Sequence, residues 1–102
     1  MTRPANKLRG EASLLLASGP ILLRPSFAAL VAAEEELGPL FALVERAAAG
    51  EFKLSEMVAL FWHCRRDDDA TRAAFSENIA QAGLAAMTPA LKTLLGQILS
   101  GR

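Results

Sequence analysis

The chain has 102 residues, of which 52% are hydrophobic and 22% are charged, and its formal net charge at pH 7 is zero. This length allows one domain with one hydrophobic core and leaves no room for a second core. Because the net charge is zero, no broad basic field attracts phosphate polymers, so the composition argues against nucleic-acid binding and favours contacts with other proteins.

The single cysteine and the short apolar runs predict the cellular compartment of the protein. Cys64 has no second cysteine to pair with, so we expect a reducing, cytoplasmic setting. The basic start and the apolar stretch after it are similar to a signal peptide, but Glu11 precedes that stretch and Gly19-Pro20 interrupts it. No apolar run reaches the ~18–20 residues that a membrane-spanning helix needs. We therefore predict a soluble cytoplasmic protein with no membrane partner.

The first quarter of the chain predicts a loose tail and a β-hairpin. Residues 1–6 are polar and contain a proline, so we assign them to a flexible N-terminal tail and residues 7–102 to a single domain. Two short apolar runs, residues 11–16 and 21–24, flank a turn-forming stretch over residues 17–20. Alternation in the first run places three apolar side chains on one face: Ala12, Leu14 and Leu16.

Five helices are predicted after Pro25, because capping residues, prolines and glycines divide this part of the chain. They are expected at residues 27–37, at 39–49, from the cap Ser55 to Arg66, at 70–82 after the cap Asp69, and from the cap Thr88 onward. Ser26 caps the first helix, and glycines end the first, second and fourth: Gly38, Gly50 and Gly83.

Apolar spacing predicts which face of each helix is buried. The expected inward side chains are Phe27, Leu30, Val31 and Leu37; Leu40, Phe41, Val44 and Ala48; Met57, Leu60, Phe61 and Cys64; Phe75, Ile79 and Ala82; and Leu91, Leu94, Leu95, Ile98 and Leu99. The predicted fold is therefore α+β: an N-terminal β-hairpin followed by a mostly helical bundle of about five short helices.

Few residues in this chain could carry chemistry. His63 and Cys64 are adjacent, so on a helix they point about 100° apart, and the chain has no further His or Cys to complete a zinc site or a nucleophile. The acidic runs 34–36 and 67–69 lack the ligand spacing of a calcium loop, and we interpret them as a solvated helix end and a helix cap. No phosphate-binding or nucleophile-elbow motif occurs. We predict no catalytic, cofactor-binding or metal-binding residues, and a protein that is not an enzyme.

Two aromatic residues are candidates for partner contacts. Phe52 and Trp62 are of the type enriched at interface centres, although they could equally complete the core. Residues 54–82 imitate a helix-turn-helix, but the second helix begins with acids and offers mainly Arg72 to a DNA groove. A small DNA-binding adaptor is thus the weakest of the binding hypotheses. The apolar excess is also compatible with a homo-oligomer.

The order of these signals resembles a known family. GEASLLL, SGP, ILLRPSFAALVAAEEELG and GEFKLSEMVALF follow one another, and the most specific stretch is residues 24–38. Over roughly residues 7–99 the chain resembles the tail assembly chaperones of gene transfer agents and tailed phages, a family also described as tail tube protein. The resemblance implies a non-catalytic protein that keeps the tape-measure protein soluble while tail tube subunits polymerise around it. The alternative is a structural tail tube or connector component of the particle.

Overall fold

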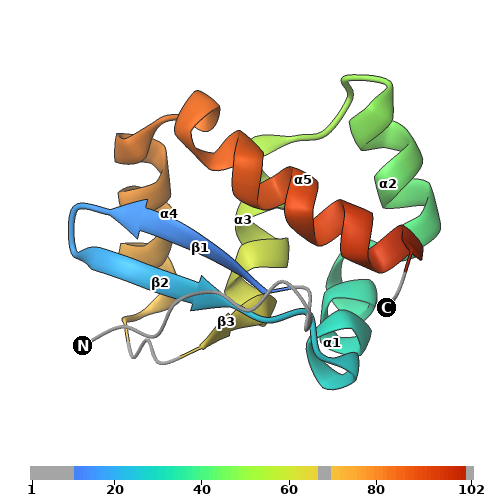
Figure 1. Cartoon of the computed structure of the whole chain (residues 1–102), viewed down its shortest axis with the longest axis horizontal. Helices are drawn as coiled ribbons and strands as arrows, with labels where there is room; N and C mark the ends of the chain where they lie inside the picture. Colours follow the sequence, from blue (N-terminus) through green and yellow to red (C-terminus); the bar gives the residue numbers. More distant parts are fainter. Residues whose placement is uncertain (1–10, 67–69, 101–102) are drawn as a thin grey trace.

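In the computed structural model, residues 11–66 and 70–100 are described, and they fold into a three-stranded antiparallel sheet and five helices (Figure 1). The strands are β1 (Ala12–Leu16), β2 (Gly19–Leu23) and β3 (Arg65–Arg66). The helices are α1 (Phe27–Leu37), α2 (Leu40–Ala48), α3 (Leu54–Cys64), α4 (Arg72–Ala82) and α5 (Leu84–Ser100). The predicted α+β class, a hairpin followed by five helices, is confirmed. The predicted tail, residues 1–6, and the predicted cap Asp69 lie outside the described residues.

The N-terminal hairpin forms where the sequence predicts it, with a tighter turn. Leu16 pairs with Gly19, so the turn is only Ala17-Ser18 and β2 begins two residues before the expected Ile21. Gly19 has a φ of 122°, a backbone angle that side chains with a Cβ rarely adopt. The predicted alternation is confirmed, because the three predicted side chains of β1 are buried and the intervening Leu15 is 76% exposed.

The third strand is not predicted by the sequence. Local pattern places Arg65 and Arg66 at the end of the third helix, but α3 ends at Cys64 and the two arginines pair with Leu22 and Leu23 of β2. A hydrogen bond of 2.7 Å from the Arg24 N–H to the Cys64 carbonyl extends this contact. The β2 edge thus supplies backbone partners that override the local helical preference.

Two of the predicted helix starts are correct or nearly so. The Ser26 hydroxyl accepts a 3.2 Å hydrogen bond from the Ala29 N–H, and α1 has the bounds that the sequence predicts. The second helix begins at Leu40, directly after Pro39, which takes the cap position. Gly38, between the two helices, has a φ of 88°, as expected for a residue that ends a helix.

The other three helices begin at different residues from those predicted. Ser55 is not the cap of α3, because the helix starts at Leu54 and the Glu56 carboxylate accepts a 2.9 Å bond from the Lys53 N–H. Thr71 caps α4, with its hydroxyl accepting from the Ala74 N–H at 3.1 Å.

The fifth helix starts one turn before the predicted cap. It begins at Leu84, so Pro89 lies inside the helix and not at its first position. The Thr88 hydroxyl donates to the Leu84 carbonyl at 3.1 Å and does not cap the helix. Met87 is buried, which explains the earlier start, because the additional turn adds an apolar side chain to the core.

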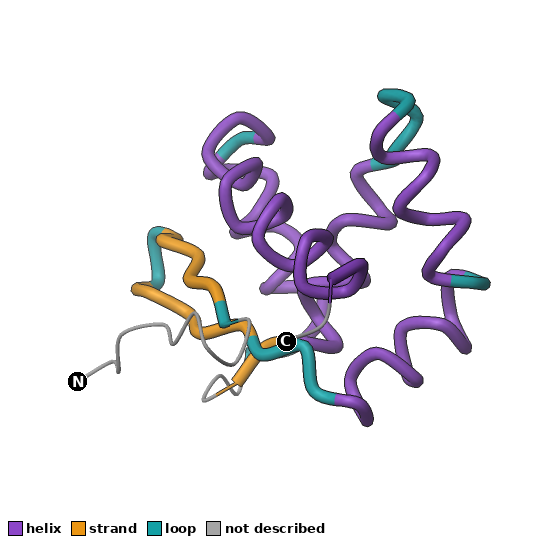
Figure 2. The backbone as a smooth tube through the Cα atoms, turned by 45° about the vertical axis from the view of Figure 1, so that its right-hand side comes forward, coloured by secondary structure: helices purple, strands orange, loops and turns teal. Residues whose placement is uncertain are grey.

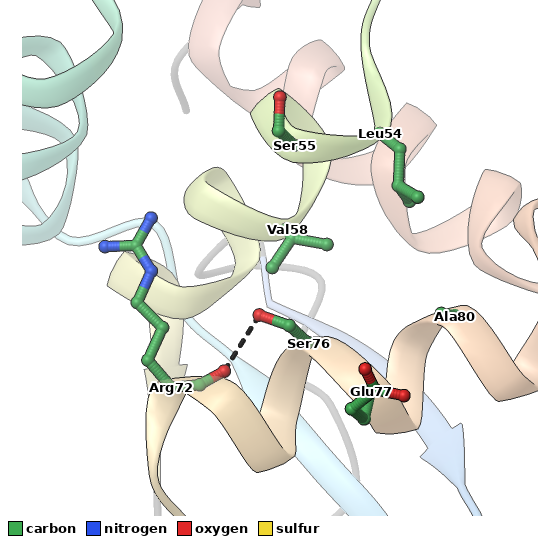
Figure 3. Close-up of a pocket in the computed structure, with 7 residues that line it drawn as sticks. All are labelled: Leu54, Ser55, Val58, Arg72, Ser76, Glu77 and Ala80. Carbon is green, nitrogen blue, oxygen red and sulfur yellow. Dashed lines mark hydrogen bonds between the residues drawn. The ribbon is translucent and has the colours of Figure 1, made fainter.

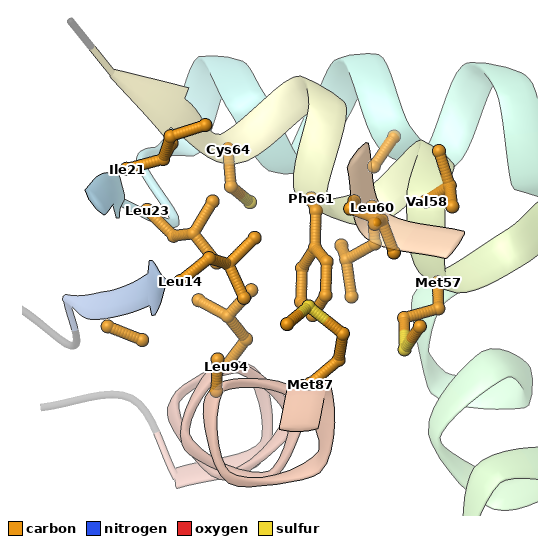
Figure 4. Close-up of a cluster of buried hydrophobic side chains, with 14 of the residues drawn as sticks. Leu14, Ile21, Leu23, Met57, Val58, Leu60, Phe61, Cys64, Met87 and Leu94 are labelled. Carbon is orange, nitrogen blue, oxygen red and sulfur yellow. The ribbon is translucent and has the colours of Figure 1, made fainter. Parts of the chain in front are cut away.

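The core lies between α3, α5 and the sheet (Figure 4). Figure 4 shows Phe61 of α3 and Met87 of α5 pointing toward one another, with Leu94 of α5 near Leu14 and Leu23 of the strands. All of the predicted α3 face is buried: Met57, Leu60, Phe61 and Cys64. The strands gather on one side of the molecule and the helices fill the other (Figure 2).

The predicted inward faces of α1 and α2 are partly wrong. Ala29 and Ala33 are the buried residues of α1, whereas Phe27 is 84% exposed and Val31 is 37% exposed. Small alanines suit the close approach of α1 to α3, and Leu30 and Leu37 pack against the core as predicted, so Phe27 and Val31 are left on the outer face. In α2, Phe41 is 69% exposed and Ala48 is exposed, while the helix buries Leu40, Leu43 and Val44. Leu99, predicted to face inward, is also exposed.

Candidate functional site

A groove runs between α2 and α5 and continues across the N-terminal end of α3. It consists of two adjoining hollows with volumes of about 470 Å³ and 150 Å³, which share Phe52, Thr88 and Leu91. The larger hollow is also lined by Val44, Ala47, Ala48, Lys92 and Leu95, and the smaller one by Lys53, Leu54, Met57 and Leu84. We call this surface the Phe52 groove.

The lining of the Phe52 groove is apolar with a positive rim. Among the lining residues just named, the charged side chains are Lys53 and Lys92. The hydroxyl proton of Thr88 is already donated to the Leu84 carbonyl within α5. The groove therefore offers hydrocarbon surface to an apolar ligand and two cations to a ligand with carboxylates at its edge.

Small residues and a braced loop keep the groove open. Ala47 and Ala48 line one wall, and their short side chains leave space that longer ones would fill. After α2, the Gly50 N–H donates to the Ala47 carbonyl at 3.1 Å, and Gly50 has a φ of 78°. This turn leads the chain into the loop that carries Phe52.

An ion pair joins α2 to α3 beside the groove. The Arg46 guanidinium donates to the Glu56 carboxylate, which is mostly buried. The Lys53 N–H and then Arg46 hold the pKa of Glu56 below its ordinary value. The pair thus fixes the start of α3, and with it Phe52, relative to α2.

The structure separates the two aromatic residues that the sequence singles out. Phe52 is partly buried and lines both hollows of the groove. Trp62 lies in the last turn of α3, about 12 Å along the helix axis from its first residue, Leu54. Its ring is 5.7 Å from that of Phe75, and the Arg65 guanidinium lies 3.4 Å from its centroid. Phe52 is thus at a surface that could receive a partner, while Trp62 packs at the edge of the core.

A third hollow lies between α3 and α4, with a volume of about 360 Å³ (Figure 3). Figure 3 shows Leu54 and Val58 of α3 facing Ser76 and Ala80 of α4. Ser76 donates its hydroxyl proton to the Arg72 carbonyl at 2.8 Å. Because Leu54 also lines the Phe52 groove, the two surfaces meet at the start of α3.

A charged cluster joins the ends of α1, α3 and α4. Arg72 donates to both carboxylate oxygens of Glu36, at 2.9 Å for Oε1, and His63 Nε2 lies 2.8 Å from the same Oε1. The Arg72 hydrogen bond, followed by that of His63, lowers the pKa of Glu36 to about 2. The sequence does not reveal this cluster, because Glu36 and Arg72 are far apart along the chain.

The acidic run at the end of α1 is only partly the solvated helix end that the sequence predicts. Glu36 is engaged as described, and Glu34 Oε2 accepts a 3.0 Å hydrogen bond from the Leu40 N–H at the start of α2. Glu35 remains exposed. This run therefore connects α1 to its neighbours through two of its three carboxylates.

The His63–Cys64 pair does not form a nucleophile in the described structure. Cys64 is buried, and burial raises the pKa of its thiol to about 12, while His63 contacts Glu36. Within residues 11–66 and 70–100, no three His, Cys, Asp or Glu side chains gather closely enough to hold a metal ion. Over the same residues, no helix has the length and apolar character needed to cross a membrane. The acidic run 67–69 lies outside these residues.

Comparison with known proteins identifies the family. The family described as "Phage tail tube protein, GTA-gp10" matches residues 9–101, nearly the whole chain. Searches of curated proteins and of solved structures gave no match. The family match confirms the resemblance found in the sequence and assigns a phage-tail role in general terms. The chain belongs to the phage tail tube protein, GTA-gp10 family.

Proposed function

We propose that this member of the family is a tail assembly chaperone that binds the tape-measure protein and keeps it soluble while the tail tube is assembled. The observation that carries the proposal is the Phe52 groove, an apolar surface between two helices. A groove of this kind receives the apolar face of an amphipathic helix, with side chains at i, i+3, i+4 and i+7 as anchors. A long helical protein with apolar stripes would otherwise aggregate through those stripes.

The surroundings of the groove support a binding role without catalysis. Phe52 supplies an aromatic anchor point, and Ala47 and Ala48 leave room for the side chains of a partner helix. The two side chains best suited to catalysis are Cys64 and His63. Cys64 is buried, and His63 contacts Glu36. We therefore propose a non-catalytic cytoplasmic factor that uses no cofactor and whose partners are the tape-measure protein and the tail tube subunits.

Co-expression with the tape-measure protein of the same particle tests this function. We expect the chain to raise the soluble fraction of the tape-measure protein, and we expect the purified proteins to associate at micromolar concentration. Ala48→Gln places a longer polar side chain in the groove without changing the charge, and it should reduce the soluble fraction. Ala73→Gln on the exposed side of α4 is the matched control. No association between the wild-type proteins would contradict the proposal.

A second candidate is a structural subunit of the tail tube or of a connector. It is favoured by the family description and by apolar side chains exposed outside the groove, on α1 and α2: Phe27, Val31 and Phe41. A repeating subunit needs two complementary surfaces, and these side chains provide a second surface. Mass spectrometry of purified particles separates the candidates. Many copies per particle would support the structural role, and absence from the mature particle would support the chaperone.

A further inference from the structure

We propose that the exposed face of α1 in one copy of the chain docks in the Phe52 groove of a second copy. The inference rests on the proposed function in one respect: both treat the groove as a docking site for a helix. It goes beyond that function because it names a second ligand of the groove, the chain itself. Three observations carry it: the chemistry of the α1 face, the chemistry of the groove and their matching lengths.

The outer face of α1 is an apolar stripe that ends in acids. With 3.6 residues per turn, four exposed side chains fall within an arc of about 100°: Phe27, Val31, Glu34 and Glu35. Phe27, at 84% exposure, is a large aromatic side chain left uncovered at the first turn of the helix. The stripe is about 12 Å long, at 1.5 Å per residue. Within one copy Phe27 and Val31 are exposed, and the Glu34 carboxylate accepts the hydrogen bond from the Leu40 N–H.

The Phe52 groove has the complementary chemistry. Its walls are apolar, and the charged residues of its lining are Lys53 and Lys92. The wall from Thr88 to Leu95 on α5 is about 10 Å long, close to the length of the α1 stripe. Phe27 and Val31 would contact the apolar walls, and the carboxylates at the end of the stripe would meet the lysines.

Charge also favours this pairing over the two symmetric ones. Two α1 faces packed together would bring the carboxylates of Glu34 and Glu35 against a second acidic pair. Two grooves facing each other would bring Lys53 and Lys92 against like charges. Like charges at an interface oppose association, whereas α1 in the groove pairs opposite charges. The contact is therefore head-to-tail, with different surfaces of the two copies in contact.

A head-to-tail contact has a consequence for the partner. Each copy in such an assembly presents one surface to the copy before it and another to the copy after it, so the assembly grows or closes into a ring. A partner helix that occupies the groove would compete with α1 and release the copies from each other. Such a helix would share the chemistry of α1, with an apolar stripe followed by acids.

Charge reversal across the contact tests the inference. Sedimentation equilibrium at low ionic strength measures the self-association of wild type, Glu35→Lys and Lys92→Glu. Glu35 is chosen because Glu34 also accepts a hydrogen bond from the Leu40 N–H. We expect each single variant to weaken self-association about fivefold, within the range of exposed charge pairs. An equimolar mixture of the two variants should recover association, because the unchanged α1 face of Lys92→Glu meets the unchanged groove of Glu35→Lys, and the new lysine of Glu35→Lys meets the new glutamate of Lys92→Glu.

Matched controls separate this contact from general surface effects. Glu77→Lys on α4 makes the same change of charge outside the groove and should leave self-association unchanged. Phe27→Ser should weaken self-association about tenfold, and Leu15→Ser, which removes a side chain of similar exposure on β1, should leave it unchanged. Circular dichroism checks that each variant is folded.

The outcomes decide the inference separately from the proposed function. A wild-type chain that stays monomeric to several hundred micromolar, or a mixture of variants that does not recover association, would overturn the inference. Binding of the tape-measure protein is measured on the same samples. If the mixture recovers self-association but the tape-measure protein does not bind, the inference is supported and the proposed function is contradicted. If the tape-measure protein binds but the mixture does not recover self-association, the proposed function is supported and the inference is overturned.

Discussion

Glu36 connects three helices through one carboxylate, and this predicts how stability depends on pH. Hydrogen bonds from Arg72 and His63 lower its pKa from 4.5 to about 2, so the folded state favours the charged carboxylate. The stability that it contributes is present above pH 4.5 and is lost as the pH falls from 4.5 to about 2. Because Glu36 is 37% exposed, solvent screening limits this contribution to about 1 kcal/mol.

Glu36→Gln should remove this part of the pH dependence. Urea unfolding at pH 5 and at pH 2.5 measures the change, and the free energy of unfolding should fall more in wild type than in the variant. Glu35→Gln, at the exposed neighbouring position, is the control and should behave as wild type does. Equal losses of stability in wild type and Glu36→Gln would show that the cluster does not stabilise the folded state.

Cys64 gives a second prediction for a single residue. Its thiol is fully buried and burial raises its pKa to about 12, so little thiolate is present at pH 8. A thiol reagent such as DTNB should react with the native protein at least ~100-fold more slowly than with the urea-unfolded chain. Fast reaction of the native protein would mean that the thiol is accessible, and a nucleophilic role for Cys64 would have to be considered again.

At the scale of elements, the caps of α3 and α4 are the most direct test of the helix boundaries. Thr71→Ala removes the hydroxyl that accepts from the Ala74 N–H and should lower the free energy of unfolding by about 1 kcal/mol. Ser55, the cap predicted from the sequence, lies within α3, so Ser55→Ala should change it by less than about 0.5 kcal/mol. Thermal unfolding of the two variants measures the difference, and a larger loss for Ser55→Ala would contradict these boundaries.

Local signals in the sequence predict several elements well. The α1 bounds follow from Ser26 and Gly38, which act locally on the adjacent backbone. The buried face of α3 follows from apolar spacing because this helix lies in the core. In these elements the preferences of the residues and the demands of the fold agree.

Tertiary contacts decide the elements that the sequence does not predict. Arg65 and Arg66 form β3 because β2 offers an edge, which no local pattern indicates. The small alanines of α1 are buried and Phe27 is left on its outer face, whereas apolar spacing alone favours burial of Phe27. An exposed Phe and a buried Phe look the same in a sequence.

The same distinction applies to the candidate site. From its residue type Phe52 is either a partner contact or a core residue, and the structure places it partly buried against the core, where it lines a groove. Ala47 and Ala48 matter because they leave space, and a small side chain gives no signal of this in a sequence. Glu36 and Arg72 come together only when α1 and α4 are placed against α3.

At the scale of the whole molecule, the two ends of α3 differ in what they contact. At its C-terminal end, His63 joins the Glu36–Arg72 pair and Trp62 packs against Phe75, so several elements are held together. At its N-terminal end, the chain opens into the Phe52 groove beside α2 and α5. The fold therefore provides a fixed scaffold at one end and an accessible apolar surface at the other, as the proposed binding of a partner helix requires.

The affinity for the tape-measure protein, measured by titration with groove variants, tests the central claim most directly. The claim is that the Phe52 groove is the surface that binds. Ala48→Gln should weaken binding by about tenfold or more, equivalent to about 1.4 kcal/mol, and Ala73→Gln should leave it unchanged. Equal affinities of wild type and Ala48→Gln, or an equal loss in Ala73→Gln, would show that the tape-measure protein does not bind in this groove.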